Sequence, residues 1–156
     1  DARVPATRRG GRAAADGAIS RMVVSGRADM TPNPSPDAIA QLNLRYDLAA
    51  MAADRCAEDG FDAIVQDLIL GKDLADFVKR IASPERYLVV LSPHVSALEW
   101  REEMRKKAAH LRLSAAALDE VLRRETAQIG YWLDCSTQTT EETVDDILTN
   151  LHRAAV

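Results

Sequence analysis

Two polar residues, Gln66 and Asp67, end the apolar segment that begins at Phe61. Open parallel sheets bind ligands beyond the carboxyl ends of their strands, so an acid at this position faces a site. The Asp67 carboxylate is suited to hold a magnesium ion through water or to orient an attacking nucleophile. The alternative is that Asp67 caps the helix that follows, and that Gln66 only hydrogen-bonds a neighbouring loop. We favour the functional interpretation of Asp67, because its position in a parallel sheet supports it.

A basic stretch provides a second candidate site. Arg101 and Arg105 lie four residues apart on one face of a predicted helix, with Lys107 on its flank. Two planar guanidinium groups on one face suit a phosphate-bearing ligand. The alternative is a solvated helix in which Glu102 and Glu103 pair with the same basic groups, and the pattern taken alone favours this alternative.

The other polar residues indicate structure rather than chemistry. Asp134 also follows a predicted strand, but the hydroxyl-bearing Ser136 nearby favours a capping or turn role. The histidines and cysteines are separated along the chain, which argues against a metal cluster or a Cys–His nucleophile pair. These residues are His94, His110, His152, Cys56 and Cys135. We expect the histidines at the surface and the cysteines as reduced thiols.

Hydrophobic periodicity predicts alternating helices and strands. Helices are expected over residues 18–30, 36–59, 73–82 and 95–109, from the Ser114 cap to about residue 127, and after the Thr139 capping box. Strands are expected over residues 61–66, 87–91 and 131–133. This alternation predicts an α/β fold, a three-layer parallel sheet with helices on both faces. Residues 1–16 are expected to form a disordered tail, and residues 17–156 a single domain.

The composition limits the classes of function. The 156 residues, 47% of them hydrophobic, suit one globular domain. A net charge of -4, with both signs mixed along the chain, provides no basic face for nucleic acid. No run approaches the roughly 18 apolar residues of a membrane span, and the N-terminus lacks the apolar core of a signal peptide. We therefore expect a cytoplasmic protein that binds neither nucleic acid nor membrane.

Five segments occur in an order that is more specific than any one of them: 21–27, 41–46, 60–71, 101–107 and 130–144. In this order they resemble a bacterial family of small P-loop phosphotransferases, described as chloramphenicol-phosphotransferase-like or AAA-type ATPase-like kinases. The resemblance covers residues 18–156, nearly the whole chain.

The resemblance implies an ATP-dependent kinase of a small hydroxyl-bearing molecule, with a three-layer α/β fold, magnesium and a mobile basic lid. It also implies roles for single residues. Asp67 would lie beside the phosphates, and Asp16 near the acceptor hydroxyl. The lid would be formed by Arg101, Arg105 and Lys107. The acceptor side would be lined by Arg27, Gln41, Arg45 and Gln66. Phosphoryl transfer needs mainly positioning and neutralisation of charge, which such residues and a metal supply.

The chain departs from this family at its start. A P-loop kinase opens with a strand and a Gly-x-x-x-x-Gly-Lys-Ser/Thr loop that cradles the nucleotide phosphates, and no segment here matches that loop. The family's Gly-Asp pair is inverted at Asp16 and Gly17, and Gln128 stands where an arginine is usual. Without the first strand, two inner strands of the sheet would each have an unpaired edge. Either these two edges pair with each other, or the N-terminal tail fills the gap poorly, or the domain is only marginally stable.

Three functions are therefore open. The first is a truncated or degenerate phosphotransferase that is inactive as given. The second is a non-catalytic nucleotide- or ligand-binding module, or a regulatory one. The third, hydrolysis of ATP, is less favoured, because it needs the same absent loop.

Overall fold

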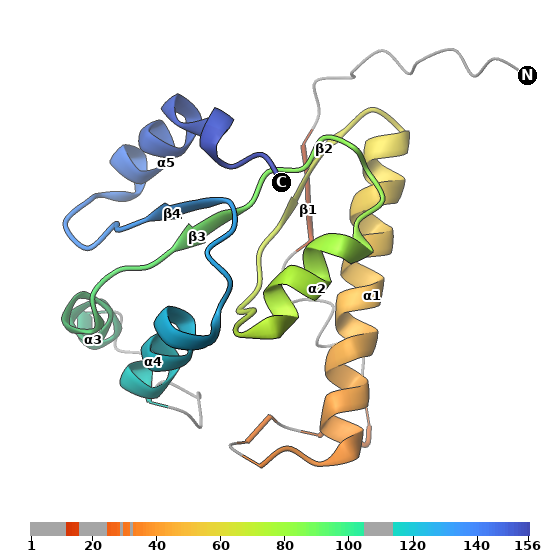
Figure 1. Ribbon diagram of the computed structural model, residues 1–156, viewed down its shortest axis with the longest axis horizontal. Coiled ribbons are helices and arrows are strands. Elements are labelled where there is room, and N and C mark those ends of the chain that lie inside the picture. The colour runs from red at the N-terminus through yellow and green to blue at the C-terminus, as the bar shows by residue number, and fades with distance from the viewer. Residues whose placement is uncertain (1–11, 16–24, 29, 32, 105–113) are drawn as a thin grey trace, which may run out of the picture. The chain divides into compact units, whose positions relative to one another are not determined.

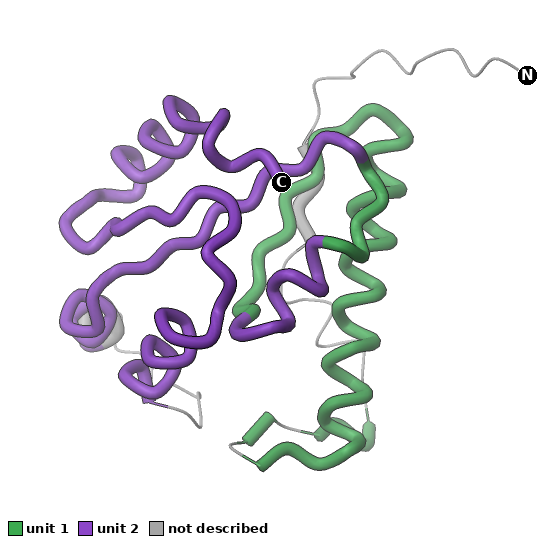
Figure 2. Tube along the Cα trace, viewed as in Figure 1, with its two compact units in different colours: residues 1–69, 79–83 green, residues 70–78, 84–156 purple. Residues whose placement is uncertain are grey.

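The computed structural model describes residues 12–15, 25–28, 30–31, 33–104 and 114–156 (Figure 1). The chain divides into two compact units (Figure 2). Unit 1 comprises residues 1–69 and 79–83, and unit 2 comprises residues 70–78 and 84–156. Each unit contains one pair of parallel strands, so each can be described separately.

Unit 1 is built on the strands β1 (Arg12–Ala15) and β2 (Asp62–Val65), which pair in parallel with Ala15 opposite Val65. The long helix α1 (Pro36–Glu58) connects them and packs against β2. Its buried stripe consists of Ala38, Tyr46, Ala49, Ala50 and Ala53. Four of these five side chains are methyl groups, which lets the helix backbone approach its neighbours closely.

The ends of α1 follow from local sequence. Ser35 is the N-cap, and its hydroxyl accepts a hydrogen bond from the Ala38 amide at 3.1 Å. Pro36 occupies the first turn, where its missing N–H is not needed. Gly60, with φ of 84°, follows the C-cap Asp59, so the chain leaves the helix in a conformation that favours glycine. The predicted cap and the predicted stop are both confirmed.

Side chains of α1 also bind the segment 79–83. The Asp54 carboxylate accepts hydrogen bonds from the Ala82 and Ser83 amides, both at 2.9 Å, and from the Ser83 hydroxyl at 2.8 Å. Arg80 donates to the Asp47 carboxylate at 2.6 Å. Unit 1 is therefore closed by polar contacts as well as by packing.

Unit 2 is built on β3 (Val89–Leu91) and β4 (Tyr131–Leu133), which pair in parallel with Val90 opposite Trp132. Its helices are α2 (Lys72–Arg80), α3 (Val95–Met104), α4 (Ala115–Glu125) and α5 (Thr140–Thr149), followed by a 3-10 turn, Leu151–Arg153. The last two residues of α2, 79 and 80, belong to unit 1. The core cluster contains Tyr131, Leu133, Cys135 and Ala154, with Val89, Ile147 and Leu151 packed against it.

The predicted caps of unit 2 are confirmed. The Ser114 hydroxyl accepts from the Ala117 amide at 3.2 Å at the start of α4. Thr139 and Glu142 form the reciprocal capping box of α5. The apolar face expected on α5 is only partly buried. Ile147 packs against the core, whereas Leu148 remains 60% exposed.

A polar network joins α5 to β4. The Asp146 carboxylate accepts hydrogen bonds from the Tyr131 hydroxyl at 2.6 Å, from Gln138 at 2.8 Å and from Asn150 at 2.9 Å. These bonds, the one from Tyr131 most of all, hold the pKa of Asp146 below its ordinary value of 3.8. Arg153 lies 4.4 Å over the Tyr131 ring and favours the same ionised form.

Acidification is expected to destabilise unit 2 through Asp146. Because the folded pKa lies below the unfolded one, the stabilisation is complete above the ordinary value and is lost as pH falls through the folded value, below about pH 4. Asp146→Asn should therefore cost stability at pH 7 and less at pH 3. Denaturant unfolding at both pH values measures this, with Asp145→Asn at the exposed neighbouring position as the control. An equal cost at both pH values would contradict it.

The predicted three-layer parallel sheet is wrong. The described strands form two separate two-stranded sheets, and most described residues are helical. A strand between two helix layers is buried on both faces, whereas the residues of β2 are mostly exposed, with Ile64 at 53%. The strands predicted at 61–66 and 87–91 exist but are shorter, and the strand predicted at 131–133 is confirmed. Short, exposed strands cannot anchor helices on both faces.

Two other expectations about the chain's start need correction. Residues 12–15, which we expected in a disordered tail, form β1 because they pair with β2. An N-terminal strand is therefore present, although the phosphate-binding loop pattern is not found in the sequence. Of the helix predicted over 18–30, residues 25–28 and 30 are not helical, and the rest lie outside the described residues.

In the described part of the chain, no helix is both long enough and apolar enough to cross a lipid bilayer.

Candidate functional site

The carboxyl ends of β1 and β2 form the edge that the sequence indicated. Since Ala15 pairs with Val65, both strands end at the same level, and Gln66 and Asp67 come directly after β2. Gln66 is exposed. Asp16 follows β1 in the sequence, but it lies outside the described residues. Asp67 is therefore the one predicted acid that the structure places at this edge.

Both oxygens of the Asp67 carboxylate are engaged. One accepts a hydrogen bond from the Leu68 amide at 2.8 Å, and the other lies 3.0 Å from Nε of Arg45. This Nε is buried and is not oriented for a hydrogen bond, so charge rather than hydrogen bonding attracts the two groups. The helix α2 begins only at Lys72, so Asp67 is not its cap.

Arg45 is held on α1 beside an aromatic ring. Its guanidinium carbon lies 5.6 Å from the centroid of Tyr46, and that of Arg80 lies 5.7 Å from the same ring. Tyr46 itself is buried. Cations near an aromatic face are attracted to it by its negative charge distribution. The ring and the Asp67 carboxylate therefore both favour this position of Arg45.

Gln41 lies one helical turn before Arg45 on α1. Its side-chain amide accepts a hydrogen bond from the Ala28 amide at 2.9 Å and donates one to the Gly26 carbonyl at 2.8 Å. Arg27, which is exposed, lies between these two residues. All the residues predicted for the acceptor side thus belong to unit 1, as does Asp67. These residues are Arg27, Gln41, Arg45 and Gln66.

The predicted lid is only partly visible. Arg105 and Lys107 lie outside the described residues. Arg101 belongs to unit 2, where its guanidinium donates to the carbonyls of Cys135 at 2.6 Å and Gln138 at 3.2 Å. Its observed role is therefore to hold the loop after β4, a contact that the sequence did not suggest.

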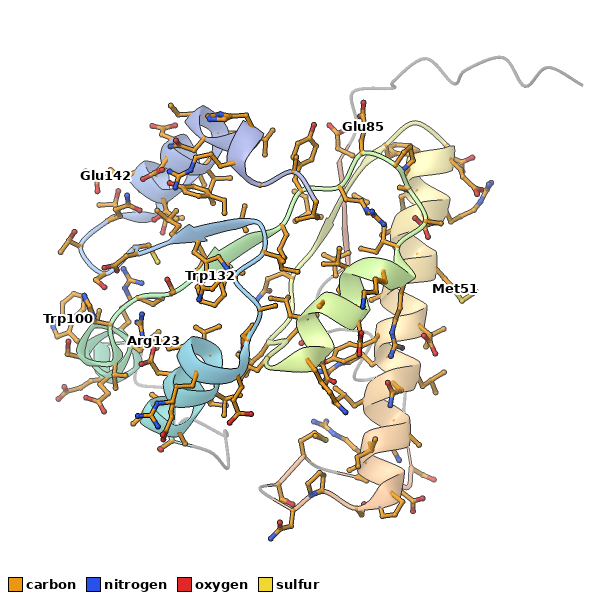
Figure 3. The ribbon with its side chains drawn as sticks, viewed as in Figure 1. Met51, Glu85, Trp100, Arg123, Trp132 and Glu142 are labelled. Atoms are coloured by element: carbon orange, nitrogen blue, oxygen red, sulfur yellow. The ribbon has the colours of Figure 1, made fainter. Side chains whose placement is uncertain are left out.

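The carboxyl ends of β3 and β4 carry a cluster that the sequence analysis did not assemble. Asp134 accepts hydrogen bonds from the amide and the hydroxyl of Ser136, which confirms its predicted turn role. Its other oxygen lies 3.3 Å from Nε2 of His94, whose amide donates to the Ser136 hydroxyl at 2.8 Å. Arg123 reaches the same strand end from α4, with a 3.4 Å contact to the Ser92 carbonyl (Figure 3).

The bonds from Ser136 are the main reason that the pKa of Asp134 lies below its ordinary value, and the charges of His94 and Arg123 act in the same direction. The carboxylate therefore stays ionised and keeps the two loops together. No signal in the sequence pairs His94 with Asp134, because they follow different strands and meet only once β3 and β4 are in register.

The residues of the edge do not fit a magnesium ion. Magnesium needs open carboxylate oxygens, whereas Asp67 is a single acid next to a guanidinium. In the part of the chain that the structure describes, no group of three or more His, Cys, Asp or Glu residues is placed to hold a metal ion. We therefore assign no chemical step to a bound nucleotide or metal.

Neither a scan against models of protein families nor a search of curated proteins finds a match to this chain. The resemblance to small-molecule phosphotransferases rests on the ordered segments of the sequence alone.

Proposed function

We propose that this chain binds a small hydroxyl-bearing molecule, the acceptor of a phosphotransferase-type reaction, and that these 156 residues alone do not transfer a phosphoryl group. The site is the edge after β2, with Arg45 and Asp67 in contact with the acceptor. The chain acts in the cytoplasm, where reduced thiols are usual; Cys56 and Cys135 are both free.

The Arg45–Asp67 ion pair carries this proposal. It joins an acid at the carboxyl end of a parallel strand to a cation on the neighbouring helix, at 3.0 Å. A partly buried pair of donor and acceptor groups can bind a hydroxyl from both sides, since the carboxylate accepts its proton and the guanidinium donates to its oxygen. Ligand hydroxyls are usually oriented in this way by a few fixed polar groups.

Two observations argue against phosphoryl transfer: the Arg45–Asp67 ion pair and the sequence itself. The cation next to Asp67 disfavours magnesium there, and no Gly-x-x-x-x-Gly-Lys-Ser/Thr segment occurs among the 156 residues. A nucleotide-binding module is the second candidate, supported by the same order of segments that resembles kinases. Calorimetric titration with magnesium–ATP separates the two, because micromolar binding without release of ADP would favour that module.

Arg45→Met is expected to abolish acceptor binding. The variant keeps a long side chain beside Tyr46 but removes the donor and leaves Asp67 without its cation. Thermal unfolding with a panel of uncharged hydroxylated compounds (chloramphenicol, nucleosides and sugars) measures this. At least one compound should raise the unfolding temperature of the wild type and should bind about tenfold more weakly to Arg45→Met.

Arg55→Met is the matched control. Arg55 lies on the same helix, but it is 68% exposed and its ion pairs are with Glu58 and Asp59 at the end of that helix. Its loss should leave the ligand-induced shift unchanged. Equal shifts in the wild type and in Arg45→Met, or no shift with any compound, would contradict the proposal. Measurable release of ADP from ATP by the wild type would contradict the absence of transfer.

A further inference from the structure

The ring of Tyr46 on α1 has two guanidinium groups beside it. The guanidinium carbon of Arg45 lies 5.6 Å from the ring centroid, and that of Arg80 lies 5.7 Å from it. Each cation also has an acid of its own, since Arg45 lies 3.0 Å from Asp67 and Arg80 lies 2.6 Å from Asp47. These acids offset the repulsion between two like charges that share one ring.

The two arginines differ in how firmly they are held. Arg80 donates to the Asp47 carboxylate at 2.6 Å, to the Asn43 carbonyl at 3.2 Å and to the Asn43 side-chain oxygen at 2.7 Å. Arg45 is paired with Asp67, but its buried Nε is not oriented for a hydrogen bond. The position of Arg45 therefore depends on attraction to a carboxylate and to the ring, whereas hydrogen bonds fix Arg80.

The main chain that carries Arg80 is anchored to the same helix. The Asp54 carboxylate of α1 binds the amides of Ala82 and Ser83, both at 2.9 Å. Arg80 is thus tied to α1 through its own side chain and through the segment that follows it. A cation held in this way stays beside Tyr46 and limits how far the ring can turn.

We propose that Arg80 is a positioning residue for the acceptor site, which fixes the Tyr46 ring so that the ring keeps the Arg45 guanidinium beside Asp67. A cation is attracted to the face of an aromatic ring, so the attraction depends on how the ring is oriented. Arg80 acts without contact with the ligand. This inference deepens the proposed function and rests on it for the ligand, but the effect of Arg80 on Arg45 is measurable without any ligand.

Exchange of the Arg45 Nε proton with water, followed by NMR, reports the position of this guanidinium, because Nε is buried. Arg80→Met keeps most of the side chain's apolar stem and removes the cation. It should speed this exchange about threefold, as should Tyr46→Leu, which matches the loss of one cation–ring contact. Tyr46→Phe keeps the ring and should keep the wild-type rate. Arg55→Met, on the same helix, is the control and should also leave the rate unchanged.

Two comparisons distinguish positioning from a general loss of structure. The main-chain amides of Ala49 and Ala50 on α1 should exchange in Arg80→Met as in the wild type, and acceleration equal to that of the Arg45 proton would contradict the proposal. The double variant Arg80→Met/Tyr46→Leu should exchange no faster than Tyr46→Leu, because Arg80 acts through the ring. Effects that multiply, or an unchanged rate in Arg80→Met, would overturn it.

Ligand binding provides the second measurement. The compound that raises the unfolding temperature of the wild type should bind about threefold more weakly to Arg80→Met. In an Arg45→Met background, Arg80→Met should have no further effect. Equal affinity of the wild type and Arg80→Met, with binding that still depends on Arg45, would refute the positioning role and leave acceptor binding intact. If no compound binds, the acceptor function fails, and the exchange rates alone decide the role of Arg80.

Discussion

Replacing Gly130 by alanine is expected to destabilise unit 2 by about 3 kcal/mol or more, since a strained backbone and a steric clash add. Gly130 has a φ of 71°, in the left-handed region that favours glycine. An added Cβ would lie 2.4 Å from the Leu88 carbonyl oxygen and 2.8 Å from the Leu88 Cβ. Neither atom can move freely, because that carbonyl accepts the Tyr131 amide at the start of the β3–β4 pair. Denaturant unfolding measures the loss.

Gly71→Ala separates the two causes. Gly71 belongs to the same unit and has a φ of 61°, but a Cβ at this position would meet no atom within 4 Å. It should therefore cost only the backbone term, about 1 kcal/mol. Similar losses for Gly130→Ala and Gly71→Ala would show that the contact with Leu88 relaxes, and would contradict the larger figure.

Thr126→Val is expected to cost about 2 kcal/mol, because it removes a buried hydroxyl without changing the shape of the side chain. Thr126 is 5% exposed. Its hydroxyl accepts from the Gly71 amide at 2.7 Å and donates to the Val121 carbonyl at 3.1 Å. Valine would leave both main-chain groups without this partner in a site that water reaches poorly. The free energy of unfolding from denaturant titration gives the value.

Thr126→Ser is the matched variant, because serine keeps the hydroxyl and loses one methyl group. It should cost less than the valine variant, about 1 kcal/mol. A serine variant less stable than the valine variant would mean that packing of the methyl group, and not the hydrogen bonds, holds the Gly71 segment to α4.

Local features of this fold were predictable from the sequence. The caps Ser35, Ser114 and Thr139 act through side chains that bond amides only a few residues ahead, so their effect depends on short-range sequence. The centres of three strands were found for the same reason, since an apolar run such as residues 87–91 is visible by itself.

The pairing of strands was not predictable in the same way. Nothing local to residues 12–15 shows that their backbone will pair with residues 62–65, because the partner lies beyond α1. The expectation of a single covered sheet also assumed that every predicted strand is buried. The exposure of Ile64 shows that β2 is not, and this depends on packing that a periodicity pattern does not contain.

In the candidate site, too, only the features that depend on local sequence were predictable. Gln41 and Arg45 are one turn apart on a helix that the sequence identified, so their common side was foreseeable. The contact of Arg45 with Asp67 depends on how α1 lies against β2. Arg101 is the opposite case, because its partners are the main-chain carbonyls of Cys135 and Gln138, and a carbonyl has no sequence signature.

The position of Ala154 affects how unit 2 is made on the ribosome. Ala154 is fully buried, and its carbonyl accepts the Leu88 amide at 2.7 Å, while the Val156 amide donates to the Arg86 carbonyl. The entry into β3 thus lacks its partners until residues 154–156 have left the exit tunnel. While residues 92–153 are being synthesised, the Leu88 amide and the Arg86 carbonyl lack these main-chain partners. Unit 2 should therefore complete its fold only after translation has passed Val156.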